Sequence, residues 1–128
     1  MSENKKILVM DDDEMILTLV SSILELNDFD VETAVDGAIA IEKYQKASAD
    51  GQTFDLVIMD LTIPGGMGGK EVIIELLKLD PDAKCAVSSG YATDPIMRNY
   101  SEFGFKGVIT KPFVVSELLS VVNDIIAS

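Results

Sequence analysis

The feature that most constrains the fold of this chain is the alternation of five short apolar runs with helix-like stretches. The runs cover residues 7–10, 31–34, 56–59, 85–87 and 107–110. The first and third are apolar at consecutive positions, which is typical of central parallel strands covered by helices on both faces. The second run alternates apolar and polar residues, so we expect that strand nearer the edge of the sheet.

Apolar residues at helical spacing follow four of these runs. The stripes lie within residues 16–23, 40–47, 72–77 and 114–125. Asp94 before Pro95 predicts an N-cap and a first-turn proline for a short fourth helix. Strands separated by helices must run parallel, with right-handed crossovers. The sequence therefore predicts an α/β domain, a (βα)₅ doubly wound five-stranded parallel sheet with strand order 2-1-3-4-5. No linker or repeat interrupts the chain, so we expect one domain over residues 1–128.

The charge balance excludes several functions. The chain has 10 Lys and Arg against 22 Asp and Glu, for a formal net charge of -12, and it has no histidine. An acidic body repels phosphate backbones and anionic lipid, so we expect no direct nucleic-acid or membrane partner. Without imidazole the chain supplies no His-based triad and no phosphohistidine of its own. The single Cys85 and the absence of a long apolar segment favour a cytoplasmic location.

Polar residues follow the strands at the edge where α/β sheets bind ligands. Asp11, Asp12 and Asp60 come after the first and third strands, which are neighbours in the predicted order. Carboxylates this close repel one another unless a cation joins them, and oxygen ligands without His or Cys favour Mg²⁺. The alternative is that residues 11–14 only cap the next helix, which is the stronger interpretation for Asp13 and Glu14. An EF-hand loop is excluded because the acids are consecutive.

Lys111, after the last strand, is a ready counter-ion for these carboxylates and a point charge for a phosphoryl group. The alternative is a surface lysine before a proline turn. Ser89 alone is equally consistent with a simple turn. The glycine run 65–69 is not a phosphate-binding loop, because Pro64 stands where that motif needs glycine. We expect the run to give the backbone freedom beside Asp60.

Taken in order, these motifs resemble a response-regulator receiver domain over roughly residues 5–127. The resemblance is carried by residues 7–12, 55–60, 63–64, 89–90 and 111–113. It implies a flavodoxin-like receiver fold in which Asp60 is the phosphoacceptor. Asp12 would bind Mg²⁺ directly, Asp11 through water, and Thr62 through its backbone carbonyl. Ser89 would hydrogen-bond the phosphoryl group, Lys111 would bridge it to the acidic pocket, and the Lys111-Pro112 bond would be cis.

Two departures from the family pattern stand out. The loop over residues 63–69 has one residue inserted and lacks the usual Asp, which makes it similar to receivers attached to hybrid sensor histidine kinases. Val108 occupies a position where many receivers carry an aromatic residue that rotates on activation. The resemblance therefore implies a receiver whose readout does not use tyrosine rotation.

The resemblance predicts a phosphorelay domain. A sensor histidine kinase or a histidine phosphotransfer domain would give its phosphoryl group to Asp60 with Mg²⁺, and the domain would switch conformation. It would be a self-phosphorylating and self-dephosphorylating switch rather than an enzyme, either stand-alone or part of a hybrid kinase. A weak homodimer through the face from the fourth strand to the last helix is also compatible.

Two alternatives to this function remain. One is a degenerate receiver that acts as a phosphorylation-independent docking module. The other is a haloacid-dehalogenase-like phosphatase, which is disfavoured because Thr62 stands where that family has a second Asp.

Overall fold

The computed structural model describes residues 4–91 and 93–128. Strands and helices alternate through this part of the chain, as the sequence predicts. In chain order the elements are β1 (Lys6–Met10), α1 (Glu14–Leu26), β2 (Asp30–Ala34), α2 (Gly37–Ala49), β3 (Leu56–Asp60), α3 (Gly69–Leu79), β4 (Cys85–Ser89), α4 (Pro95–Arg98), the 3₁₀ helix η1 (Tyr100–Phe103), β5 (Gly107–Thr110) and α5 (Val115–Ala127).

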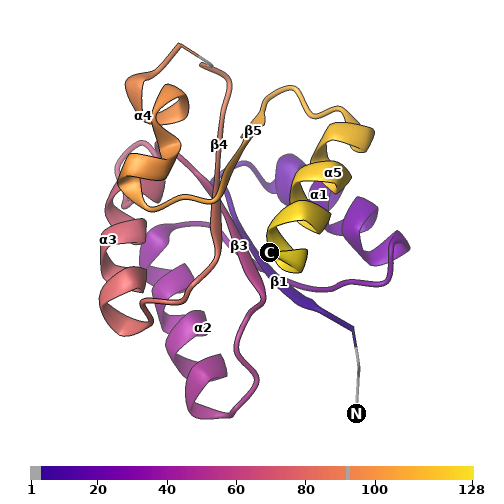
Figure 1. The fold of residues 1–128 in the computed structure, drawn as a ribbon, viewed down its shortest axis with the longest axis vertical. Helices are drawn as coiled ribbons and strands as arrows, with labels where there is room; N and C mark the ends of the chain where they lie inside the picture. Colours follow the sequence, from indigo (N-terminus) through magenta and orange to yellow (C-terminus); the bar gives the residue numbers. More distant parts are fainter. Residues whose placement is uncertain (1–3, 92) are drawn as a thin grey trace.

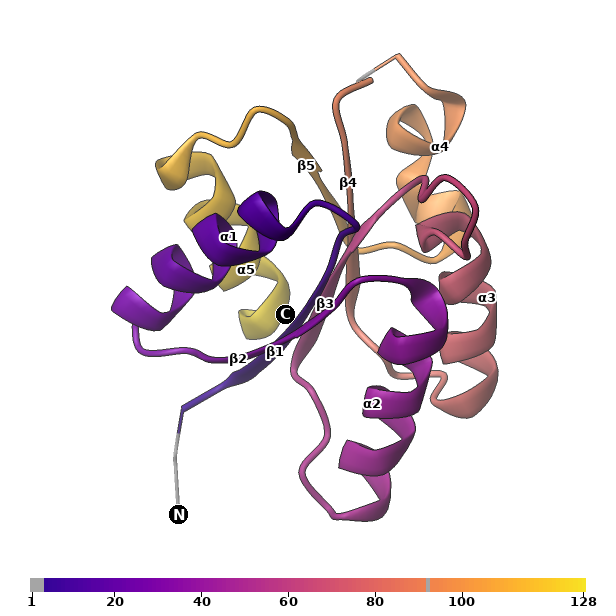
Figure 2. The same ribbon diagram turned by 180° about the vertical axis from the view of Figure 1, so that it is seen from behind.

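The five strands form one parallel sheet with the order β2-β1-β3-β4-β5, which confirms the predicted topology. Helices α1 and α5 cover one face, and α2, α3 and α4 cover the other, as Figure 1 and the reverse view in Figure 2 show. Strand β2 lies at the edge and is mostly half-buried, whereas every residue of β3 is buried. The alternating pattern of β2 and the continuous apolar run of β3 follow from these positions.

Alternate residues of each central strand enter two separate apolar cores. In β1, Ile7 and Val9 pack with α1 and α5, whereas Leu8 and Met10 pack with α2 and α3. All four side chains are at most 2% exposed. Burial on both faces is why this strand is apolar at consecutive positions.

Short polar residues set the helix starts. The Asp13 side chain caps α1 by accepting a hydrogen bond from Met15 N–H, and Asp36 caps α2 in the same way from Ile39 N–H. The predicted cap of α4 is confirmed: Asp94 accepts from Ile96 N–H, with Pro95 in the first turn. These caps fix where α1, α2 and α4 begin.

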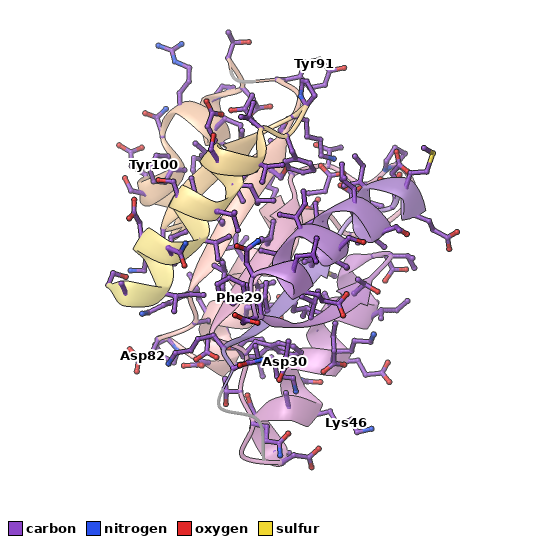
Figure 3. All side chains as sticks on the ribbon, turned by 90° about the vertical axis from the view of Figure 1, so that its right-hand side faces the viewer. Phe29, Asp30, Lys46, Asp82, Tyr91 and Tyr100 are labelled. Atoms are coloured by element: carbon purple, nitrogen blue, oxygen red, sulfur yellow. The ribbon has the colours of Figure 1, made fainter. Side chains whose placement is uncertain are left out.

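The carboxyl ends of the strands lie at one edge of the sheet. Figure 3 shows Tyr91, two residues after β4, at this edge, with Asp30 and Asp82 at the opposite end. Strand β4 extends two residues beyond the predicted 85–87, so Ser88 and Ser89 are buried strand residues rather than turn residues. Among the described residues, no helix is both long and apolar enough to cross a membrane.

Candidate functional site

Three carboxylates meet at the carboxyl edge of β1 and β3. One oxygen from each of Asp11, Asp12 and Asp60 lies within 4.8 Å of the others. The pairing of Met10 with Met59 in the β1–β3 register brings the two strand ends side by side. Asp11 is 3% exposed, and its Oδ1 is held by Asp13 N–H at 2.9 Å. The clustering that the sequence predicted is therefore present, and Asp13 stands outside it as the α1 cap.

Lys111 points into this cluster. Its Nζ lies 2.6 Å from Asp11 Oδ2 and 3.5 Å from Asp60 Oδ2, and its side chain is 21% exposed. Burial by itself lowers the pKa of Lys111, but the hydrogen bond to Asp11 and the charges of Asp60 and Asp11 outweigh it and raise the pKa. The lysine stays an ammonium, and the alternative of a surface lysine is excluded.

Without a further cation, the ionised form of the Asp60 carboxyl is disfavoured in this pocket. Burial raises its pKa to about 6, and the charges of Asp11 and Asp12 add to this, while Lys111 opposes it. Three carboxylates face one ammonium, so negative charge remains in excess around Asp60. This all-oxygen donor set suits a hard divalent cation such as Mg²⁺.

Ser89 closes β4, the strand next to β3. Its side chain is 6% exposed, and its Oγ accepts a hydrogen bond from Tyr91 N–H at 3.1 Å. Within the described residues the Ser89 side chain makes no hydrogen bond to Asp60 or Lys111, although the Ser89 backbone carbonyl accepts one from Lys111 N–H at 3.0 Å. The structure thus places Ser89 at the carboxyl edge of the sheet, and its hydrogen bond to a phosphoryl group stays a prediction.

Thr62 lies two residues after Asp60 in the loop before α3, and the backbone of Gly68 lies close against this loop. A Cβ on Gly68 would lie 2.6 Å from Leu61 O and 3.0 Å from Thr62 Cα. Gly65 has a φ of 74°, in the left-handed region that glycine favours. The glycine run thus permits both a turn and a close backbone approach to the segment that carries the Thr62 carbonyl.

Two smaller expectations concern the last strand. The Lys111-Pro112 peptide bond is cis, as predicted. Val108 is half-buried and packs against the core shared with α2 and α3.

Sequence reasoning missed two features of the site. Ser88, which pairs in register with Asp60, is only 2% exposed and has a hydroxyl without a hydrogen-bond partner among the described residues. On α1, Met15 and Leu19 are 81% and 48% exposed next to the acidic edge. Two signals in the sequence could have pointed to them. One is the serine pair that ends an apolar strand, and the other is the presence of apolar residues outside the buried stripe of a helix.

Comparisons with known proteins identify relatives of this chain. The family model of the response regulator receiver domain matches residues 7–123. The chemotaxis protein CheY of Thermotoga maritima is 30% identical over 122 residues, covering 94% of this chain and 97% of that protein. The sensor kinase CckA of Brucella abortus is 28% identical over 126 residues, which cover 98% of this chain but only 13% of the kinase. A CheY-like receiver domain structure from Methanospirillum hungatei superposes with a TM-score of 0.84 at 28% identity, covering 98% of this chain and 95% of the other.

The fold and the acidic edge define a switch domain of two-component signalling. This chain belongs to the response regulator receiver domain family. Receiver domains are in general signalling switches rather than catalysts, and they bind Mg²⁺ at an acidic pocket and interact with histidine kinases or phosphotransfer partners.

Proposed function

We propose that this chain accepts a phosphoryl group on Asp60 from a protein phosphohistidine and switches conformation in response. The observation that carries the proposal is the pocket itself. A buried carboxylate ends β3, two further carboxylates lie within 4.8 Å, and an ammonium lies 3.5 Å away. A nucleophile, ligands for a cation and a positive charge for phosphoryl oxygens thus share one site.

The chemistry is one displacement at phosphorus. An Asp60 oxygen attacks in line, a P–O bond forms, and the P–N bond to the donor imidazole breaks, with its electron pair staying on that nitrogen. A water molecule later adds to the acyl phosphate, which releases inorganic phosphate and restores the carboxylate. Because these 128 residues contain no histidine, the phosphorylated imidazole must come from outside them.

The other residues neutralise charge. Asp12 directly, Asp11 through water and the Thr62 carbonyl would hold Mg²⁺ together with Asp60, and the bound ion would neutralise charge that spreads over the phosphoryl oxygens. The Lys111 ammonium would donate a hydrogen bond to one of those oxygens. The Ser89 hydroxyl would turn away from Tyr91 N–H and donate a hydrogen bond to another of these oxygens.

The switch follows from contacts that exist only when the phosphoryl group is present. New hydrogen bonds to Ser89 and Lys111 favour a different arrangement of the ends of β4 and β5 and therefore of the face between β4 and α5. Val108 has no phenol to rotate, so backbone and serine movement would carry the change. The same face is where we place a weak homodimer.

The donor is proposed to dock on α1. Met15 and Leu19 expose apolar side chains within the first two turns of the helix that starts at the acidic edge. A small phosphate donor is too small to contact such a surface while it reacts at Asp60, whereas a protein donor can bury it. A histidine kinase or a histidine phosphotransfer domain fits both the surface and the chemistry, whether this chain acts alone or within a hybrid kinase.

The direct test uses acetyl phosphate and Mg²⁺. We expect a phosphorylated chain whose adduct is cleaved by hydroxylamine, as an acyl phosphate is. Asp60→Asn should abolish the adduct, while Asp55→Asn, a change at a carboxylate before β3, should not. An adduct of equal yield in Asp60→Asn would refute the assignment.

The docking-module alternative is decided by a calorimetric titration with Mg²⁺. A receiver that docks without phosphorylation has no need to bind the ion at Asp12 and Asp60. Saturable binding that is lost in Asp12→Asn supports the phosphoacceptor function.

A further inference from the structure

Ser88 carries a buried hydroxyl that the proposed phosphoryl chemistry does not use. The residue is 2% exposed, and in the described part of the chain its Oγ has no hydrogen-bond partner. Buried polar atoms are nearly always paired, because an unpaired one loses its bonds to water without replacement. An unpaired hydroxyl at this place therefore needs an explanation.

Ser88 stands next to Asp60 on the same face of the sheet. The two residues pair across β3 and β4, and paired residues of neighbouring strands point to the same side. Ala86, two residues before Ser88, packs into the core beneath α1 and α5. Strand alternation places Ser88 on this side as well.

Lys111 must cross β4 to reach the acidic cluster. It follows Ile109, the β5 partner of Ser88, by two residues, and its own N–H donates to Ser89 O at 3.0 Å. Its Nζ ends at Asp11 and Asp60, on the far side of β4. The lysine side chain thus spans the strand on which the Ser88 hydroxyl stands.

The ammonium and a metal ion compete for the same oxygens. Lys111 Nζ lies 2.6 Å from Asp11 Oδ2, and Asp11 and Asp60 both belong to the carboxylate cluster that could hold a metal ion. A divalent cation bound to these carboxylates would repel the ammonium and take up its acceptors. The ammonium has three N–H donors and little exposure, so it needs another acceptor close by.

We propose that Ser88 is a positioning residue for Lys111. When a divalent cation occupies the carboxylates, Lys111 Nζ withdraws over β4 and donates a hydrogen bond to Ser88 Oγ, the acceptor that is unused in the metal-free pocket. This keeps the ammonium beside Asp60, where the phosphoryl group of the proposed function would form. Only this last consequence rests on the proposed function, because the lysine movement requires the cation alone.

The test is Mg²⁺ calorimetry on the full chain. Ser88→Ala should weaken Mg²⁺ binding about tenfold, the equivalent of one charged hydrogen bond. Ser88→Cys, similar in size but a weak acceptor, should do the same. In a Lys111→Met background Ser88→Ala should change the affinity by less than about twofold, because the ammonium that uses the hydroxyl is gone.

Ser21→Ala is the matched control. Ser21 carries the other buried hydroxyl without a partner among the described residues, and it lies on α1 rather than beside Asp60. Its removal should leave Mg²⁺ binding unchanged. In thermal denaturation without Mg²⁺, Ser88→Ala should be as stable as the wild type or more so, and only its gain in Tm on adding Mg²⁺ should shrink.

Three results would overturn the proposal: wild-type Mg²⁺ affinity in Ser88→Ala, an equal loss with and without Lys111, or no Mg²⁺ binding by the wild-type chain. Normal Mg²⁺ binding with no adduct from acetyl phosphate would instead remove the proposed function and leave the role of Ser88 intact.

Discussion

Lys111 Nζ lies 2.6 Å from Asp11 Oδ2, although 100 residues separate the two along the chain. The contact joins the end of β5 to the end of β1, across β4 and β3. It neutralises part of a pocket that would otherwise hold only negative charge. The same contact places the ammonium where a cation would bind.

Replacing Lys111 should separate these two effects. Lys111→Met should lower the metal-free free energy of unfolding by about 2 kcal/mol, between the values for exposed and buried ion pairs. It should strengthen Mg²⁺ binding about tenfold, because the competing ammonium is gone. Urea denaturation and calorimetry measure the two quantities. Weaker Mg²⁺ binding would show that the lysine supports the ion instead.

Asp60 should make the metal-free protein less stable as pH rises. Its pKa of about 6 in the folded chain exceeds the ordinary 3.8, so the folded state holds the proton more tightly. The stability from this group is fully present below pH 3.8 and is lost as pH rises through 6. Asp60→Asn removes the ionisation and should be more stable than the wild type by about 3 kcal/mol at pH 7.

The same difference should vanish well below pH 3.8, where the Asp60 carboxyl is neutral in both the folded and the unfolded chain. Urea denaturation in EDTA at several pH values measures it. Asp94→Asn is the matched control, because asparagine still caps α4. A difference between Asp60→Asn and the wild type that does not depend on pH would contradict the raised pKa.

Gly68 should be intolerant of a side chain. In Gly68→Ala the new Cβ would lie 2.6 Å from Leu61 O, so the segment before α3 must move. We expect a loss of about 1–3 kcal/mol in the free energy of unfolding, together with weaker Mg²⁺ binding through the displaced Thr62 carbonyl. Gly66→Ala is the control, since its Cβ would find its nearest neighbour at 3.4 Å. Equal effects of the two changes would exclude the backbone approach as the cause.

Leu19 should affect the rate of phosphoryl transfer from a protein donor but not from a small-molecule donor. Leu19→Ser removes apolar surface near the acidic edge and should slow transfer from a phosphohistidine protein about tenfold, the effect of one moderate contact residue. Its rate with acetyl phosphate should stay unchanged. Leu26→Ser alters a side chain that is 85% exposed at the other end of α1 and should affect neither rate. Equal slowing with both donors would place the defect in the pocket rather than in docking.

Much of the fold could be predicted from local pattern. Ile7 to Met10 are apolar in sequence because both faces of β1 are buried, and Asp94 with Pro95 starts α4 because cap chemistry is local. The end of β4 could not be predicted, because serines favour turns. Burial between β3 and β5 overrode that preference for Ser88 and Ser89.

By itself, the sequence determined which residues end the strands: two acids after β1, an acid on β3 and a lysine after β5. Strand periodicity and the parallel topology are enough to place them at one edge. The tertiary structure alone decided how they meet. It set the 2.6 Å contact of Lys111 with Asp11, the burial that raises the pKa of Asp60, and the unpaired hydroxyl of Ser88. These depend on distances and desolvation between segments far apart in the chain, which no local pattern encodes.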